Sequence, residues 1–571
     1  MALIALLTLL VLAAGYRLYG RFIARRFELD DARPTPAVAA ADGVDFVPTS
    51  RFYLLGQHFS AIAAAGPIAG PILACLAFGW LPCLLWIGLG VILIGAVHDF
   101  SSLVASVRHR AASVAEMMRD HVGRPAWLAM VAFIWLALLY VLVAFCDITA
   151  NTFVGKTENL TGLGHSFNAG GAVALASSLY LLLSIVMGLV QRRLNPPLWL
   201  LTLIFVPATL ACIGLGTRFS TLLLLDQRGW SMAILGYCFL GALLPVWLLL
   251  QPRGYLGGFV LYMALLVGLT GVFFSDLPIA QPAFKTWNAP GPTGSLFPFM
   301  FVTIACGACS GFHGLVCSGT TSKQIRHETD CRPIGYGGML LEGLVAVISL
   351  CTVMFVAPAD VAGRGPGRLY GDGLGRFLTL IIGEEHLGFA RTFGAMAFST
   401  FVFDTLDVAT RLGRYLVQEL LSRRGFFARV LATAATVAIP ALILVGARAE
   451  GGPPAYMNFW VLFGTANQLL AALTLMAVAV WLRREGKRTW FVVAPMGFVL
   501  FITVWSLLRH IEAGLRAIAE RGVTLDPVTI NGMVAAVLLL LAAYLALRCW
   551  RAAFQPGLRP VGARADAHSG P

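Results

Sequence analysis

The sequence has few charged residues and no polar stretch long enough to fold as a separate soluble domain. Charged residues make up 12% of its 571 residues, about half the share found in an ordinary soluble protein. Hydrophobic residues make up 58%, and the mean hydropathy is +0.80. This composition excludes an ordinary soluble protein and predicts a chain that crosses the bilayer many times, because each crossing takes roughly 20 apolar residues.

The usual signatures of soluble enzymes are also absent. The sequence contains no glycine-rich phosphate-binding loop, no G-x-S-x-G turn and no H-E-x-x-H pair. We therefore expect neither an enzyme nor an ATP-driven pump, and no cofactor beyond a coupling ion. The energy for transport would come from an ion gradient.

The excess of positive charge, +13 from 41 basic and 28 acidic residues, lies in short clusters between the apolar stretches. That distribution follows the positive-inside rule of membrane proteins, so nucleic acid is rejected as a partner. Most of the eleven cysteines lie within apolar stretches. Cys306-x-x-Cys309 could belong to a metal site, but no Cys/His set at zinc-finger spacing accompanies it. We favour packing inside a helix and expect no metal and no disulfide.

About 15 stretches are long and apolar enough to cross a bilayer. If the N-terminus lies outside and the loop with Arg17, Arg21, Arg25 and Arg26 lies in the cytoplasm, most basic clusters and the C-terminus also become cytoplasmic. The first stretch has no basic segment before it and no small-residue cleavage site after it, so we expect a retained anchor helix. The expected spans are 1–16, 55–77, 80–107, 127–147, 172–191, 197–215, 230–250, 255–274, 297–318, 336–357, 391–410, 428–446, 457–482, 490–508 and 530–548.

Two of these expected spans are interrupted by glycine, proline and histidine. One interruption lies within residues 58–71, which contain Gly66-Pro67 and Gly70-Pro71, and the other lies within residues 307–321. Lipid tolerates a broken helix only where the freed backbone groups face protein or a water-filled cavity. Two broken spans in one chain therefore predict a secondary transporter with its site near the membrane midplane.

Ionisable side chains within the spans are candidate functional residues, because a membrane interior makes them costly. A histidine on an interrupted segment can take part in proton coupling or can simply bond a freed carbonyl. All of the set except His98, Asp147 and Glu342 fall at a similar depth under the expected topology, which predicts a shared polar cavity open toward the cytoplasm. The full set is His58, His98, Asp99, Asp147, His313, Glu342, Asp404 and Asp407.

Asp404, Asp407, Arg411 and Arg414 follow one another at helical spacing and lie on one face of their expected helix. Asp407 and Arg411 are four residues apart and can form a purely structural pair. Asp404 is expected to be freer to bind an ion or a proton. The basic segment at 411–427 either extends this helix or lies along the inner membrane surface.

Small and polar residues at the interruptions complete the candidate site. Exposed amides near Gly66 and Gly311 could attract a substrate carboxylate. Hydroxyls at the end of the second segment could bind a carboxylate or sodium, or could only cap a helix. Asn458, Asn467 and Gln468 more often join helices than touch substrate. The candidates of this type are Ser60, Gly66, Pro67, Gly70, Ser310, Gly311, Ser318, Thr320 and Thr321.

These motifs resemble the carbon starvation protein A family of bacterial inner-membrane transporters. The resemblance implies uptake of peptides, or of pyruvate, during nutrient limitation, and a kinship with the amino acid–polyamine–organocation superfamily, whose core is an inverted repeat of five plus five helices. It rests on residues 35–37, 42–49, 58–71, 95–100, 307–321, 328–330, 334–337, 407–414 and 463–468.

By this resemblance residues 1–19 form an anchor helix, 20–400 the main transporter region, 401–510 a C-terminal five-helix region, and 511–571 the last span with a polar tail. The outer loop at 358–390 is short for the family, and an extra N-terminal span is not present. The interrupted spans are the second and the ninth, seven apart, so a seven-plus-seven repeat is the alternative to inserted helices.

We therefore expect an all-α polytopic membrane protein with two discontinuous helices, working by alternating access as a symporter coupled to protons or sodium. The alternative is a membrane nutrient sensor that binds the same metabolites without moving them. The sequence leaves the choice between peptide and pyruvate open, and also the oligomeric state.

Overall fold

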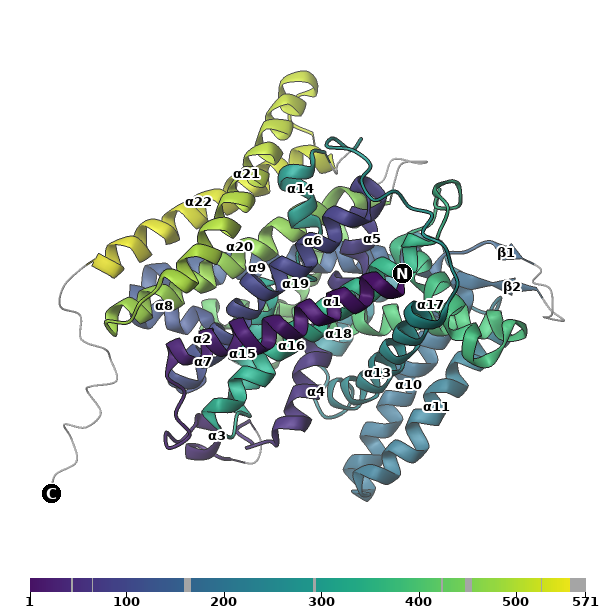
Figure 1. Ribbon diagram of the computed structural model, residues 1–571, viewed down its shortest axis with the longest axis horizontal. Coiled ribbons are helices and arrows are strands. Elements are labelled where there is room, and N and C mark those ends of the chain that lie inside the picture. Colours follow the sequence, from purple (N-terminus) through teal and green to yellow (C-terminus); the bar gives the residue numbers. More distant parts are fainter. Residues whose placement is uncertain are drawn as a thin grey trace.

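The computed structural model describes residues 1–42, 45–63, 65–158, 166–290, 294–422, 425–446, 454–524 and 526–554. Within them the chain is a bundle of packed helices with one two-stranded antiparallel sheet, β1 (Thr157–Glu158) and β2 (Phe167–Asn168), at one end (Figure 1). The all-α membrane architecture expected from the composition is confirmed.

The helices follow the apolar stretches of the sequence. The first eleven are α1 (Ala2–Ala14), α2 (Gly20–Phe27), α3 (Pro36–Ala39), α4 (Arg51–Ile62), α5 (Gly66–Phe78), α6 (Trp80–Gly90), α7 (Ala96–Arg108), α8 (Val114–Val122), α9 (Arg124–Phe153), α10 (Ala169–Leu194) and α11 (Leu198–Arg218). The others are α12 (Gln227–Leu243), α13 (Leu250–Phe274), α14 (Leu296–Thr303), α15 (Gly311–Gly319), α16 (Gly337–Met354), α17 (Pro366–Ile382), α18 (Leu387–Leu421), α19 (Phe426–Gly446), α20 (Ala455–Arg484), α21 (Trp490–Arg521) and α22 (Pro527–Phe554).

Eleven helices of the described chain are long and apolar enough to cross a membrane, or twelve if the bent pair α4–α5 counts as one span. The other three expected spans are also helical but do not meet this criterion of length and hydropathy. The helix α12 has 17 residues, the span at 297–318 is split into α14 and α15, and α18 is 35 residues long but carries several charges. Each of the 15 expected stretches thus has a helical counterpart, although length and composition alone single out only 11 or 12.

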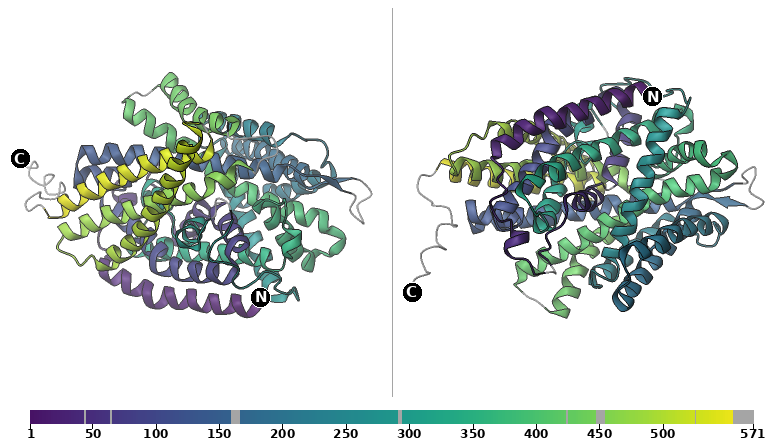
Figure 2. Two further views of the ribbon diagram at one scale, coloured as in Figure 1. Left: turned by 90° about the horizontal axis from the view of Figure 1, so that it is seen from above. Right: turned by 60° about the horizontal axis from the view of Figure 1, so that its bottom comes forward.

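Many apolar side chains point away from the bundle, as a lipid-facing surface requires. The first helix lies along the outside of the bundle (Figure 2), and its Leu3 and Leu10 are 68% and 58% exposed. By contrast, α20 is buried along its whole apolar length. Since lipid tails solvate leucine as well as a protein core does, the exposed residues fit a membrane environment.

One helix was missed in the sequence. Residues 358–390 were expected to be an outer loop, but they contain α17, a 17-residue helix with a mostly buried face. Charged residues lower its average hydropathy, while its glycines let it lie close to α18: a Cβ on Gly371 would come 2.7 Å from Cβ of Ala395. Small residues of this kind permit close helix packing within membranes.

The helix α18 continues without a break from Leu387 to Leu421. Residues 411–421 of the basic segment 411–427 are therefore a helical extension of the preceding span, and residues 426–427 begin α19; residues 423–424 lie outside the described part of the chain. The divisions expected at 400/401 and 510/511 fall within α18 and α21. The division into regions stays a prediction.

The two interrupted spans cross each other at their breaks. The helices α4 and α5 meet at an angle of 47°, and seven residues separate α14 from α15. A Cβ on Gly66 would lie 2.3 Å from Sγ of Cys306, and one on Gly70 would lie 2.6 Å from the carbonyl oxygen of Thr303. The glycines of one span thus make room for the backbone of the other, which brings the two breaks together inside the bundle.

The close packing around this crossing can be tested at a glycine of α20. A Cβ on Gly464 would lie 1.9 Å from the carbonyl oxygen of Val302 on α14. We expect Gly464→Ala to lower the free energy of unfolding by about 1–3 kcal/mol, since α14 must move away, as measured by thermal unfolding in detergent. The matched control is Gly497→Ala on α21, where no atom lies within 4 Å of the added Cβ. Equal stability of both variants would contradict the packing.

Candidate transport site

The crossing of the interrupted spans is lined on one side by a chain of buried ionisable residues. His58 comes from α4, Asp99 from α7, His313 from α15 and Glu342 from α16. Each is at most 1% exposed. Four helices from distant parts of the sequence therefore bring titratable groups to one place inside the bundle.

Asp99 is held by two histidines. Nδ1 of His98 lies 2.8 Å from Oδ1 of Asp99, and Nδ1 of His313 lies 2.8 Å from Oδ2. An ionised carboxylate only accepts hydrogen bonds, so each ring donates through its Nδ1–H. The other nitrogen of His313, Nε2, lies 3.1 Å from Oε2 of Glu342. A neutral ring can donate to one of these carboxylates, whereas a protonated ring can donate to both.

His58 lies beside this chain without bonding to it. Its Nδ1 lies 2.9 Å from Oγ1 of Thr321, and its Nε2 has no hydrogen-bond partner among the described residues. A Cβ on Gly338, one turn before Glu342 on α16, would lie 2.9 Å from the His58 ring. The structure thus brings together His58, Asp99, His313 and Thr321 of the candidate residues, enclosed in protein rather than open to one face.

Asp404 and Asp407 belong to a second cluster, built around an arginine that the sequence analysis did not single out. Arg253, on the first turn of α13, is fully buried. Its Nε lies 2.8 Å and its Nη2 2.7 Å from Oδ1 of Asp404, while its Nη1 bonds Oδ2 of Asp407. The hydroxyl of Tyr237 on α12 also donates to Oδ2 of Asp407, over 2.7 Å.

This cluster corrects two expectations. The structural pair that Asp407 and Arg411 could form is not made: Nη2 of Arg411 donates to the carbonyl oxygen of Gly241 over 2.6 Å. Asp404 is not free, because Arg253 binds it. The single layer of ionisable residues expected from depth is divided into two clusters on different helices, since depth along the membrane does not tell which helix faces which. The available signal for Arg253 was its isolation in the sequence, since it is the only charged residue between positions 229 and 275.

The glycines of the interruptions serve close packing in this structure. A Cβ on Gly311 would lie 2.3 Å from the carbonyl oxygen of Asn467, and the side chain of Asn467 accepts from the backbone N–H of Phe312 over 2.9 Å. Asn467 therefore caps α15, and Gln468 donates to the carbonyl of Phe301 over 2.9 Å. These amides join helices, as expected from their types.

The remaining candidates lie near the breaks or at the end of α15. Ser310 bonds Asn467, and Ser318 donates to the carbonyl of Gly314, within its own helix. Thr320 is exposed. Pro67 lies beside Gly307, whose added Cβ would be 3.5 Å from its Cα.

The face at which α15 ends is closed by polar contacts, which we call the end-face contact. It joins residues 28–42 and 45–51, before and at the start of α4, and Arg108 at the end of α7 with the segment 325–330. Arg108 Nε lies 2.7 Å from Oε1 of Glu328, and Arg51 Nε lies 2.5 Å from Oδ1 of Asp330. Asp31 accepts from the backbone N–H and the hydroxyl of Thr329. Its partial burial alone would raise the pKa of Asp31, but these hydrogen bonds hold it below the ordinary value, so the contact keeps its charge.

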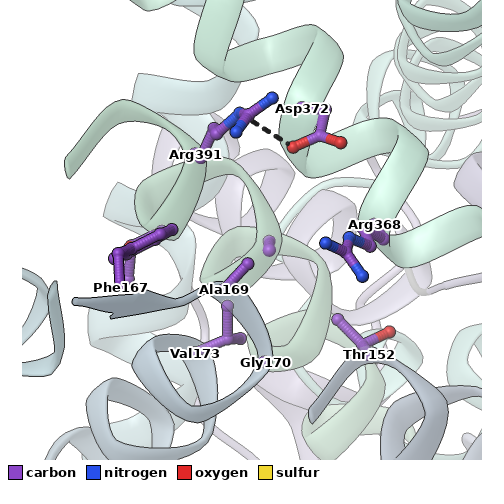
Figure 3. Close-up of a pocket in the computed structure, with 10 residues that line it drawn as sticks. Thr152, Phe167, Ala169, Gly170, Val173, Arg368, Asp372 and Arg391 are labelled. Atoms are coloured by element: carbon purple, nitrogen blue, oxygen red, sulfur yellow. Dashed lines mark ion pairs between the residues drawn. The ribbon is translucent and has the colours of Figure 1, made fainter. Parts of the chain in front are cut away.

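At the opposite end of the bundle, α9, α10, α17 and α18 surround a small hollow (Figure 3). Arg391 Nε lies 3.1 Å from Oδ1 of Asp372, and the side chain of Arg368 points into the same hollow. None of the candidate residues lines this hollow.

The chain is similar to known proteins over most of its length. A model of the family described as "Carbon starvation protein CstA" matches residues 1–363 and 359–506. The chain belongs to the CstA family. Within it, the chain is 32% identical to the pyruvate/proton symporter BtsT of Escherichia coli strain K12, over 87% of this chain and 80% of that protein. It is also 32% and 33% identical to the peptide transporters CstA of Campylobacter jejuni and Bacillus subtilis, which it covers to 78% and 89%.

Solved structures resemble this CstA-family chain more distantly. A crystal structure of the Eremococcus coleocola manganese transporter matches with a TM-score of 0.48 and 13% identity, over 89% of this chain and 97% of that one. MhsT in complex with L-phenylalanine matches with a TM-score of 0.43 and 14% identity, over 86% and 98%.

Proposed function

We propose that this protein is a secondary transporter of the bacterial inner membrane that takes up pyruvate or short peptides together with protons by alternating access. The observation that carries the proposal is the crossing of two interrupted spans beside buried His and Asp side chains. Ionisable groups are costly inside a membrane and are kept there where they serve transport. The names of the relatives, a pyruvate/proton symporter and peptide transporters, support the same class of substrate.

In this proposal the interrupted spans move against each other at their crossing when the site changes its access from one side of the membrane to the other. His58, Asp99 and His313 hold α4, α7 and α15 together in the closed structure, and the end-face contact seals one side. Opening either face requires the short half-helices to move against each other, about the end of α4 and the start of α5 in one span and about residues 304–310 in the other. We place the end-face contact and the C-terminus in the cytoplasm, because the basic loops gather there. The family name supports a role during carbon starvation.

The experiment is uptake of labelled pyruvate and of labelled dialanine into proteoliposomes of the purified protein, with and without an inward proton gradient. We expect the gradient to stimulate uptake of one of them and an inward sodium gradient to have no such effect. If only the sodium gradient stimulated uptake, sodium rather than the proton would be the coupling ion. Binding of either compound without uptake above empty liposomes would instead support a membrane nutrient sensor.

A further inference from the structure

We propose that the Nε/Nη2 edge of Arg253 binds the carboxylate of the substrate, and that Asp404 leaves this edge when it takes up the coupling proton. This inference rests on the proposed function and names both the chemical group that is recognised and the way it is coupled. One proton and one carboxylate then enter the cluster together. The protein's own acid and the substrate compete for the same two N–H groups.

The first argument is the geometry of the guanidinium. Nε of Arg253 donates to Oδ1 of Asp404 over 2.8 Å, while Nη2 lies 2.7 Å from the same oxygen but has no hydrogen-bond partner among the described residues. These two N–H groups form one edge of the planar fork, and that edge matches the two oxygens of a carboxylate. Asp404 uses the edge with only one oxygen, and its Oδ2 makes no hydrogen bond within the described chain. A substrate carboxylate would therefore make the better bidentate pair.

The second argument is the difference between the two acids. Asp407 is fully buried and is bonded by both Arg253 and Tyr237. The side chain of Asp404 is 16% exposed and has Arg253 as its single polar partner among the described residues. A proton or water therefore reaches Asp404 first. Protonated Asp404 loses its attraction to the guanidinium, whereas Asp407 keeps Arg253 in place through Nη1.

The third argument is the charge of the whole cluster. The titratable groups that face it are Tyr180 of α10, Tyr237 and Cys238 of α12, Arg253 of α13, and Asp404, Asp407 and Arg411 of α18. Adding H⁺ to Asp404 and a carboxylate to Arg253 leaves the sum of these charges unchanged. The pair thus enters without a new unpaired charge, whereas either alone would create one, at a cost inside a membrane. Joint binding is therefore favoured over separate binding.

The surroundings offer further polar groups and little bulk. The hydroxyl of Thr400, on the turn of α18 before Asp404, is buried and has no hydrogen-bond partner among the described residues. Its side chain lies beside Gly257. A Cβ on Gly258 would meet no atom closer than 3.8 Å, which is Oγ of Ser60 on α4. Gly258, five residues after Arg253 on α13, therefore lies beside α4 of the first interrupted span.

The test is equilibrium binding of labelled pyruvate and labelled dialanine to the purified full-length protein between pH 5.5 and 8. For the wild type we expect binding to weaken as the pH rises, because ionised Asp404 returns to Arg253. Asp404→Asn mimics the protonated acid and is expected to bind with an affinity that does not change with pH, while its uptake no longer responds to a proton gradient. Arg253→Lys, which keeps the charge but not the planar edge, is expected to weaken binding at every pH.

The matched control is Asp372→Asn, an aspartate of similar exposure, 18%, that also pairs with an arginine. It is expected to keep the pH dependence of the wild type. The inference is overturned if Asp404→Asn retains that pH dependence or if Arg253→Lys binds as the wild type does. If Asp404→Asn does not fold, Asp404→Glu decides: its longer acid must shift the pH at which binding weakens, and an unchanged profile overturns the inference. If the wild type shows gradient-driven uptake, the proposed function stands, whichever result these variants give.

Discussion

His313→Ala is expected to lower the free energy of unfolding by about 3–5 kcal/mol, because it leaves Glu342 as a buried charge without a partner. His313 is the only described residue that lies within ion-pair distance of Glu342, at 3.1 Å. Uptake is expected to fall by tenfold or more, since roughly 1.4 kcal/mol in one step of the cycle already changes its rate tenfold. Thermal unfolding in detergent and uptake into proteoliposomes measure the two effects separately.

Two further variants separate the structural loss from the loss of transport. Glu342→Gln added to His313→Ala removes the unpaired charge and should recover much of the stability, but not the uptake. The matched control is His386→Ala, a histidine 3.9 Å from Glu385 whose side chain is 58% exposed. It should change neither quantity. If the double variant recovers uptake together with stability, His313 serves the fold alone.

Arg253→Met is expected to destabilise the protein by a similar amount, about 3–5 kcal/mol, because Asp404 and Asp407 then face each other without their shared cation. Denaturation in detergent would measure it. Arg253→Lys should fall between this variant and the wild type, since an ammonium group keeps the charge but cannot hold both acids in one plane.

The control for Arg253→Met is Arg509→Met. Arg509 also pairs with an acid, Glu512, at 2.6 Å, but its side chain is 49% exposed. Such surface pairs contribute about 0–1 kcal/mol. A loss of stability as small as that of the control would mean that water or another cation already compensates the two aspartates.

The sequence was sufficient for the family, for the helical membrane fold and for the two interruptions. Gly66-Pro67 at the start of α5 and Gly307 between α14 and α15 mark helix breaks that have local causes, and local causes can be read from a sequence. The close approach of Gly70 to Thr303 was not predictable, because it depends on how two spans more than 200 residues apart cross. The helix α17 escaped detection since its charged residues mask a face that is buried.

The candidate site was predicted in part. His58, Asp99 and His313 do lie together, but Asp404 and Asp407 lie elsewhere, with Arg253. Periodicity places Asp407 and Arg411 on one helix face, yet it cannot show that Arg411 reaches a carbonyl of α12 instead. Which side chains pair is decided by the packing of helices, which periodicity along a single helix does not reveal.

The end-face contact gives the first helix a mechanical role. On its own α1 would look like a passive anchor, with leucines spread over its lipid-facing side. Yet Arg108, which binds Glu328, also donates to the carbonyl oxygens of Phe27 and Glu28 at the end of α2. Arg108 on α7 thus bonds both the segment after α15 and the end of the first span, Ala2–Phe27, so opening of this face disturbs a residue that also holds the first span. Because the exposed leucines of this span face outward, it connects the lipid-facing surface of the bundle with the end-face contact.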